Sequence, residues 1–434
     1  MDKIYIKTQI AMRQAEFPTD LKKRENPLPV NAGKIVTVPG VRRCGKSSRM
    51  ESVVNALLAS GVERKRILWM GFDDERLVSM NSDELDRIIE AYREMYPDIE
   101  LASVYMFFDE IQLIENWEYF IMRLYKHSTK NIYISGSNAT MLSSELKSAL
   151  RGWPVEEETL PLSFREYCDF NGFKTDSWLE SDMARLRNAF ESYNNNGGFP
   201  EVVLTNNSLN KVKILQTYFD TMLLKDLVEH YNLSNIEVLR YFLKRIMANL
   251  TKPTSIRAIH GDIKSRGLKV SKDDLYEWAN HACDIFMFIR VPNYSKSLQK
   301  IESSQPKYYC IDNGLRNAVL LPQSNDEGKK LENTVFLQLY RLRTPIDRIF
   351  YYHGKGECDF VIQRGVEIDS LIQVTWNMDD QETRQREING LIEASDVTGC
   401  RNLFIITADT DEEIRLSDNR IINVLPAWRW LLGR

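Results

Sequence analysis

Several features are scarce in this chain of 434 residues, and each absence excludes a class of protein. The six cysteines are scattered, without a C-x-x-C pair or a histidine spacing typical of zinc sites, which argues against a disulfide framework or a structural metal. No run of about 18 apolar residues occurs, so no membrane-spanning helix is expected. The first residues, Met-Asp-Lys-Ile, lack the apolar core of a signal peptide. We therefore expect a cytoplasmic protein with reduced cysteines and no membrane partner.

The overall composition is that of a globular protein. Hydrophobic residues make up 43% of the chain and charged residues 27%, and the formal net charge is −4. This balance gives no global nucleic-acid-binding signature, because such proteins usually carry a basic excess. The length predicts two or three domains, and no internal repeat or low-complexity tract is visible.

The clearest motif is a glycine-rich loop. Residues 40–47 match the pattern G-x-x-x-x-G-K-S, between an apolar β-branched stretch at 35–38 and a helix-forming segment at 47–60. This strand, loop and helix context is typical of a phosphate-binding loop, in which backbone N–H groups and the helix N-terminus face a polyphosphate. Lys46 would reach the β- and γ-phosphates of ATP, and the Ser47 hydroxyl would hold Mg²⁺. The predicted nucleotide-binding residues are Gly40, Val41, Arg42, Arg43, Cys44, Gly45, Lys46, Ser47 and Ser48.

A second motif is an apolar run that ends in two carboxylates, at residues 104–110. A continuous apolar run is typical of a strand buried on both faces, and ligands of open α/β sheets collect at the carboxyl ends of such strands. Asp109 is therefore predicted beside the magnesium, and Glu110 is predicted to polarise an attacking water.

Polar residues also follow a third predicted strand, at residues 131–135. Ser137 and Asn138 could touch the γ-phosphate or the hydrolytic water, and Asn138 is preferred for this catalytic role. Ordinary turn chemistry explains a Gly-Ser-Asn sequence almost as well.

The middle of the chain is basic. Residues 240–300 contain twelve Lys and Arg and five Asp and Glu, a net charge of +7. Short helical patterns around 255–259 and 272–278 precede an apolar strand-like run at 285–289, a succession that fits a winged helix. Such a module could contact DNA phosphates, although a basic run is also typical of a solvated face and many winged helices bind only protein.

From residue 308 onward the pattern is again α/β. An amphipathic helix is predicted at 331–340 and strands at 350–353, 358–362, 371–375 and 401–407.

Taken together, these landmarks resemble a family of prokaryotic ATPases of the AAA superfamily with a C-terminal domain of uncharacterised function, the AAA_14 and DUF4143 architecture. The matching segments are residues 40–47, 107–112, Trp117, 135–137, 160–167, 197–200, 309–315, 332–333, 357–360 and 372–374. The resemblance implies an N-terminal ATPase domain at 1–205, a helical and winged-helix segment at 206–300, and a domain at 301–434 similar to PD-(D/E)xK nucleases. The family pattern has a Gly-Arg pair where this chain has Gly152-Trp153, with Arg151 one position before the pair, so a role for Arg151 as an arginine finger is only weakly indicated.

The resemblance places a possible, degenerate nuclease site in the last domain. Glu332, Asp359 and Gln373 stand at spacings similar to those of the nuclease core, but the third motif position is Thr375, which cannot supply the missing cation. Lys355 and Glu357 could substitute, since Glu357 and Asp359 share one face of a strand. A nuclease fold without its chemistry is the favoured interpretation.

The sequence thus predicts a Mg²⁺-dependent ATPase whose nucleotide state controls its C-terminal domains on DNA or a protein partner. An ATP-regulated metal-dependent DNA nuclease and a slowly turning nucleotide-gated scaffold are the alternatives. A homo-oligomer is also compatible with the pattern.

Overall fold

The computed structural model describes residues 2–74, 76–77, 80–81, 84–137, 154–321 and 326–433. The chain divides into two compact units, Met1–Thr159 and Leu160–Arg434, which are described separately. The predicted division into three domains stays a prediction. No helix in the described part of the chain is long and apolar enough to cross a membrane.

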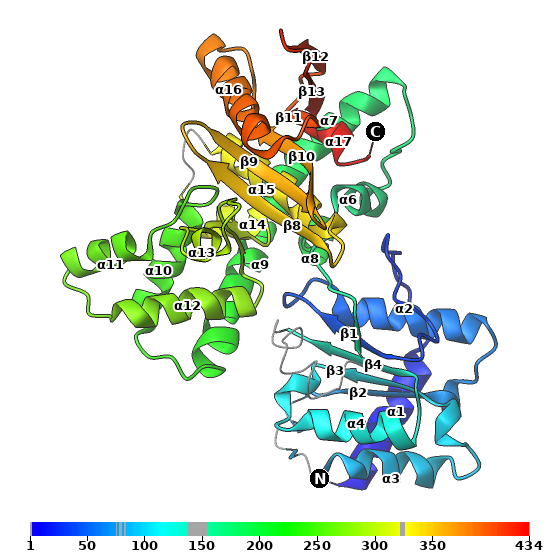
Figure 1. Cartoon of the computed structure of the whole chain (residues 1–434). Helices are drawn as coiled ribbons and strands as arrows, with labels where there is room; N and C mark the ends of the chain where they lie inside the picture. Colours follow the sequence, from blue (N-terminus) through cyan, green and yellow to red (C-terminus); the bar gives the residue numbers. More distant parts are fainter. Residues whose placement is uncertain are drawn as a thin grey trace. The chain divides into compact units, whose positions relative to one another are not determined.

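A five-stranded sheet in the order β2-β3-β4-β1-β5 forms the centre of the N-terminal unit (Figure 1). All of its strand pairs are parallel, which confirms the predicted α/β sheet. The strands are β1 (Ile35–Pro39), β2 (Ile67–Gly71), β3 (Tyr105–Asp109), β4 (Ile132–Gly136) and β5 (Pro154–Glu156). Their apolar residues are buried on both faces, as a parallel sheet between helices requires.

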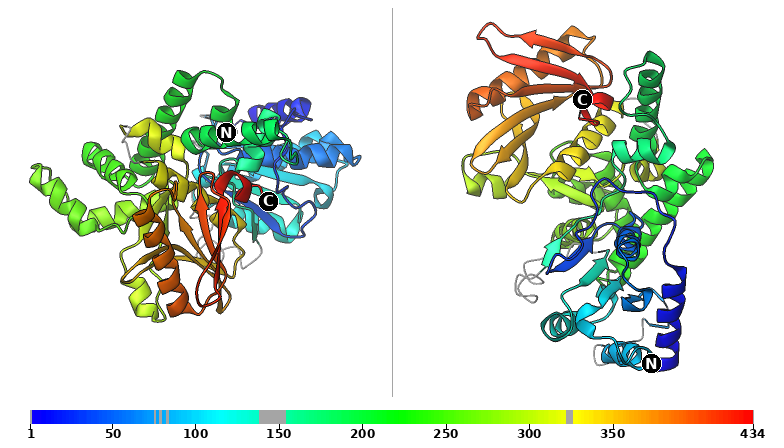
Figure 2. Two further views of the ribbon diagram at one scale, coloured as in Figure 1. Left: turned by 90° about the horizontal axis from the view of Figure 1, so that it is seen from above. Right: turned by 90° about the vertical axis from the view of Figure 1, so that its right-hand side faces the viewer.

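Helices cover both faces of this sheet (Figures 1 and 2). Buried side chains of α1 (Lys3–Glu16), α3 (Asp86–Met95) and α4 (Trp117–His127) share one apolar cluster with one face of the strands. Helix α2 (Lys46–Ala59), which follows the glycine-rich loop, packs on the other face. Three short 3₁₀ turns, η1 (Arg64–Arg66), η3 (Leu101–Ser103) and η4 (Ile111–Leu113), lie in the connections.

The strand order decides which chain segments meet at the carboxyl edge. Strand β4 lies between β1 and β3, with Ser135 paired in register with Val38 and Ile134 paired with Phe108. The loop after β1 and the carboxylates after β3 therefore meet around the end of β4.

The C-terminal unit contains a six-stranded mixed sheet in the order β12-β13-β11-β10-β9-β8. The strands are β8 (Asp347–His353), β9 (Glu357–Arg364), β10 (Glu367–Val374), β11 (Leu403–Thr407), β12 (Glu412–Arg415) and β13 (Ile421–Pro426). Helix α15 (Glu327–Leu342) packs on one face and α16 (Gln381–Thr398) on the other. Helix α17 (Ala427–Trp430) ends the described chain.

The rest of this unit is mostly helical, with a two-stranded antiparallel sheet of β6 (Phe288–Val291) and β7 (Lys307–Cys310). Its remaining elements are α6 (Phe164–Asn171), α7 (Glu180–Asn196), α8 (Pro200–Leu204), α9 (Ser208–Thr221), the π-helix η6 (Met222–Glu229), α10 (Ile236–Ala248), α11 (Ile256–Ser265), α12 (Lys272–Asp284), α13 (Leu298–Glu302) and α14 (Asn313–Val319). Helices α10, α11 and α12 precede the β6–β7 pair in the chain, and the predicted winged helix stays a prediction.

We predict that Phe107→Ala destabilises the N-terminal unit by about 3–5 kcal/mol. The ring is fully buried and stacks between Trp69, at a centroid distance of 5.3 Å, and Tyr133, at 4.7 Å. Scanning calorimetry would measure this loss of stability as a lower melting temperature of the N-terminal unit. The control is Tyr119→Ala, which removes a ring that is 71% exposed and should change stability by no more than about 0.5 kcal/mol. Equal effects of the two substitutions would contradict this packing.

Candidate functional site

The glycine-rich loop owes its shape to two glycines. Gly45 has a left-handed φ of 98° where α2 begins, a conformation that glycine adopts without a steric cost. Gly40 lies so close to the neighbouring chain that a Cβ atom there would be 2.1 Å from the carbonyl oxygen of Thr159. The two positions of the motif that demand glycine are thus the two places where the backbone has no room or no tolerance for a side chain.

The ammonium group of Lys46 is buried in this loop. The side chain is 4% exposed, and its Nζ donates to the carbonyl oxygens of Gly40 at 3.2 Å and Val41 at 3.3 Å. The third partner is the Glu110 carboxylate, with Nζ to Oε1 at 3.1 Å. All three N–H groups of the ammonium therefore have an oxygen partner.

Lys46 and Glu110 keep each other charged despite their burial. Burial by itself lowers the pKa of Lys46, but the Glu110 carboxylate raises that pKa above its ordinary value. Burial likewise favours the neutral form of Glu110, but the Lys46 ammonium lowers the pKa of Glu110 below its ordinary value. Breaking this contact would leave two buried charges without compensation.

Asp109 and Ser47 lie together beside this pair. Burial raises the pKa of Asp109, and hydrogen bonds from the Ser135 and Ser47 side chains oppose the rise. The Ser135 hydroxyl donates to Asp109 and accepts from the backbone N–H of Glu110 at 3.0 Å. Ser135 thus fixes the Asp109 carboxylate and the backbone of Glu110 from the neighbouring strand.

Two residues of this site were not selected from the sequence, Ser135 and Gln112. The amide of Gln112 donates to Glu110 at 2.6 Å and to the Ser137 hydroxyl at 3.4 Å. For Ser135, the available signal was a polar residue at the end of an otherwise apolar strand. Gln112 lies in the segment 107–112 that resembles the family pattern, but that resemblance assigns it no role.

The other predicted loop residues lie around this centre. Val41 and Cys44 are buried, and the Cys44 thiol donates to the carbonyl oxygen of Thr159 at 3.1 Å. Arg43 and Ser48 are exposed, and Arg42 is near enough to Glu110 to lower its pKa. The predicted catalytic residue Asn138 and the weakly indicated Arg151 lie outside the described residues.

This arrangement has the groups that a magnesium–nucleotide complex needs. The Ser47 hydroxyl and the Asp109 carboxylate are adjacent oxygen donors, which suit Mg²⁺. Lys46 is the first residue of α2, and backbone N–H groups at a helix N-terminus stabilise an anion. The donor set therefore fits Mg²⁺ and a polyphosphate together.

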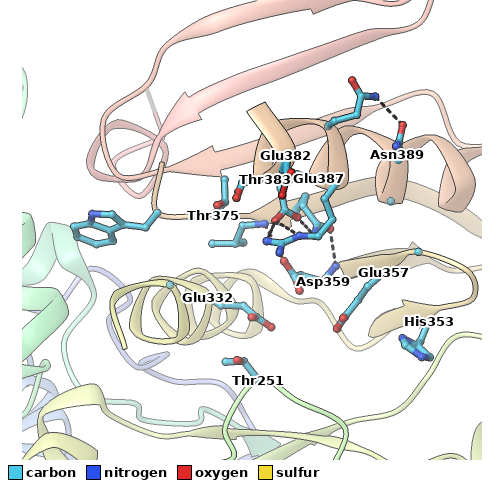
Figure 3. A pocket seen from close by; sticks show the side chains of 18 of the residues that line it. Thr251, Glu332, His353, Glu357, Asp359, Thr375, Glu382, Thr383, Glu387 and Asn389 are labelled. Atoms are coloured by element: carbon cyan, nitrogen blue, oxygen red, sulfur yellow. Dashed lines mark hydrogen bonds and ion pairs between the residues drawn. The ribbon is translucent and has the colours of Figure 1, made fainter. Parts of the chain in front are cut away.

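A second charged cluster lies in the C-terminal unit, on the wall of a cavity of about 1150 Å³ (Figure 3). The predicted residues Glu332, Asp359 and Gln373 all line this cavity, together with Lys355, Glu357 and Thr375. The fully buried Lys307, which the sequence did not indicate, makes ion pairs with Glu332, Glu357 and Asp359.

The basic segment 240–300 presents two different surfaces. On α12 the exposed residues include Asp273, Asp274 and Glu277, so this helix offers an acidic face. The exposed basic residues of the segment include Arg257 and Lys264 on α11, and Arg266 just after that helix. The predicted basic patch therefore does not extend over α12.

This chain matches two known domain families and is similar to two known proteins over most of its length. Residues 32–168 match the AAA domain family AAA_14, and residues 187–326 match a domain of unknown function, DUF8612. The protein MJ1544 of Methanocaldococcus jannaschii, itself uncharacterised, is 32% identical over 411 residues, which cover 92% of this chain and 88% of that protein. An uncharacterised protein of Haemophilus influenzae is 26% identical over 399 residues, covering 92% of this chain and 94% of that protein.

The chain therefore belongs to a family of uncharacterised prokaryotic proteins in which an AAA domain precedes an uncharacterised C-terminal domain. This confirms the predicted architecture, with DUF8612 matched in place of the expected DUF4143.

Likeness to solved structures is slight. Cdc6p from Pyrobaculum aerophilum has a TM-score of 0.26 at 11% identity, over 65% of this chain and 86% of that chain. PCH-2 of C. elegans has a TM-score of 0.24 at 13% identity, over 51% of this chain and 57% of that chain. TM-scores this low support no inference about this chain.

We predict that Ser135→Ala shifts the pH dependence of Mg²⁺–nucleotide binding. The hydroxyl favours the ionised form of Asp109, so its loss raises the pKa of that carboxyl further. Because a metal ligand must be deprotonated, the acidic limb of the affinity profile should move to higher pH. The position of this acidic limb is determined by measuring the affinity for a fluorescent ATP analogue across the acidic pH range. Ser103→Ala is the control, since its hydroxyl donates to the carbonyl oxygen of Glu100, outside the site. An unshifted limb in Ser135→Ala would contradict the assignment.

Proposed function

We propose that this protein is a Mg²⁺-dependent ATPase, with Lys46, Ser47, Asp109 and Glu110 as its reaction centre. The observation that carries the proposal is the meeting of a buried lysine, on a loop shaped by Gly40 and Gly45, with the two carboxylates at the end of β3. The matched AAA domain spans all of these residues and supports the same conclusion.

The contacts of Lys46 suggest how nucleotide binding prepares the site. Two of its partners are neutral carbonyl oxygens and only the third, Glu110, is charged. A phosphate oxygen can replace that carboxylate as the anionic partner, and Glu110 is then released to orient a water molecule. Bound Mg²⁺ would neutralise part of the phosphate charge. Gln112 holds the released carboxylate in place through its amide.

We predict opposite effects on binding and turnover for two variants. Lys46→Ala should lose both ATP affinity and hydrolysis, because the ammonium contacts the phosphates. Glu110→Gln should bind ATP at least as tightly as wild type, because Lys46 no longer has a competing carboxylate, but should hydrolyse it about 10²–10⁴-fold more slowly. Phosphate release and binding to a fluorescent ATP analogue measure the two quantities.

Lys34→Ala and Glu115→Gln are matched controls, because both side chains are exposed and lie outside the cluster. If the Lys46 and Glu110 variants hydrolyse ATP as fast as wild type, the site assignment is wrong. Tight binding by wild type without phosphate release would instead support a nucleotide-gated scaffold.

We further propose that the nucleotide state controls a winged-helix segment and a nuclease-like domain in the C-terminal unit. Contact with DNA would fall on the basic side of α11, whereas the acidic face of α12 favours a basic protein surface. The predicted division at residues 1–205, 206–300 and 301–434 is part of this proposal.

A metal-dependent DNA nuclease is the competing function, and the convergence of Glu332 and Asp359 on one cavity favours it. We expect wild type not to nick supercoiled plasmid DNA with Mg²⁺ or Mn²⁺, because a lysine already binds these carboxylates. Nicking that disappears in Asp359→Ala would establish the nuclease instead. Arg364→Ala, an exposed change on the same strand, serves as the control.

A further inference from the structure

The buried lysine of the C-terminal unit is surrounded by carboxylates from two different elements. Lys307 is on β7 and is fully buried. Its Nζ lies 3.2 Å from Oε1 of Glu332 on α15, 2.7 Å from Oε1 of Glu357 and 3.0 Å from Oδ1 of Asp359, both on β9. One nitrogen atom thus holds together three acidic side chains that are distant in sequence.

The ammonium is hydrogen-bonded to the two buried carboxylates. It donates to Glu332 at 3.2 Å and to Asp359 at 3.0 Å, and it forms an ion pair with Glu357. The Tyr309 hydroxyl also donates to Glu332 at 2.7 Å, and the Val374 N–H donates to Asp359 at 2.9 Å. These contacts hold Glu332 and Asp359 beside the nitrogen.

Gln373, the third residue of the predicted nuclease site, also has partners within the protein. Its carbonyl oxygen accepts from the Asp359 N–H at 3.1 Å, and its amide donates to Glu387. Gln373 therefore supports the backbone of Asp359.

We propose that Lys307 is the built-in cation of this site, and that its ammonium occupies the place that a divalent metal would take among Glu332, Glu357 and Asp359. Carboxylates collected within 3.2 Å of one point repel one another, most strongly for the buried Glu332 and Asp359, and a cation at that point offsets the repulsion.

The charge balance supports this reading of the cluster. Three carboxylates exceed one ammonium, and burial raises the pKa of both Glu332 and Asp359, so protonation of a carboxyl relieves the excess. The same carboxylates raise the pKa of Lys307 well above its ordinary value despite its burial, so the ammonium stays charged. Removing that ammonium would leave a pocket of acidic oxygens open to a cation.

The cavity lined by Glu332, Glu357 and Asp359 therefore has a fixed positive charge bound to its acidic wall, and this conclusion does not depend on the proposed ATPase activity.

The first test compares wild type with Lys307→Met, using the full chain without nucleotide. Methionine keeps most of the packing volume and removes the charge. We expect wild type to melt at the same temperature in EDTA and in Mn²⁺. Lys307→Met should melt at a lower temperature in EDTA, recover in Mn²⁺, and bind one more Mn²⁺ per chain by electron paramagnetic resonance titration.

Lys252→Met is the matched control, because Lys252 lines the same cavity outside the ion-pair cluster, and it should behave as wild type. The carboxylate of Asp109 is common to all three proteins, so the difference in bound Mn²⁺ reports only on the C-terminal unit. A Lys307→Met protein whose melting responds to neither EDTA nor Mn²⁺ would overturn the proposal.

A second measurement uses wild type alone and decides the question if Lys307→Met does not fold. Bound Fe²⁺ generates radicals that cut the backbone next to the metal, and mass spectrometry locates the cuts. We expect no cuts near Glu332 or near residues 357–359. Cuts at these positions would show that a divalent metal enters the cluster beside Lys307, which contradicts a built-in cation.

Discussion

A buried ammonium group must find oxygen partners for its three N–H groups, and this requirement organises both charged sites of the protein. Lys46 meets it with two backbone carbonyls and one carboxylate, and Lys307 meets it with three carboxylates. The difference has a chemical consequence. An incoming anion can replace the single carboxylate at Lys46, whereas at Lys307 it would meet three negative groups that already enclose the positive charge.

The two lysines therefore differ in whether their partners can be exchanged. At the carboxyl edge of the parallel sheet, Lys46 and Glu110 stabilise each other, and in the proposed mechanism a phosphate oxygen replaces Glu110 as the partner of Lys46. In the C-terminal unit, Tyr309 and Val374 donate to the carboxylates of Glu332 and Asp359, and Gln373 accepts from the backbone N–H of Asp359, so that these two residues are held in place. An AAA domain is thus joined in sequence to a unit whose acidic centre is already neutralised in part.

The sequence predicted the features whose residues lie close together in the chain, and it missed those that only the tertiary fold brings together. The glycine-rich loop, Lys46 and the paired carboxylates Asp109 and Glu110 occupy short segments whose spacing carries their meaning, and the parallel sheet followed from them. Ser135 acts across a strand pair, and its role depends on β4 lying between β1 and β3, which no local pattern specifies. Lys307 is 25 residues before Glu332 and 52 before Asp359, so only the tertiary fold brings them together. The sequence indicated Glu332 and Asp359 through their spacing but did not indicate Lys307, so the two carboxylates were interpreted as part of a degenerate metal site.

The central proposal is that a phosphate oxygen replaces Glu110 as the partner of Lys46. A crystal structure of the protein with Mg²⁺ and a non-hydrolysable ATP analogue tests it most directly. We expect the Nζ of Lys46 to lie within hydrogen-bond distance of a phosphate oxygen, with the Glu110 carboxylate turned away from it and toward the terminal phosphate. A nucleotide bound elsewhere, or a Lys46 that still pairs with Glu110 while the phosphates lie out of reach, would contradict the account.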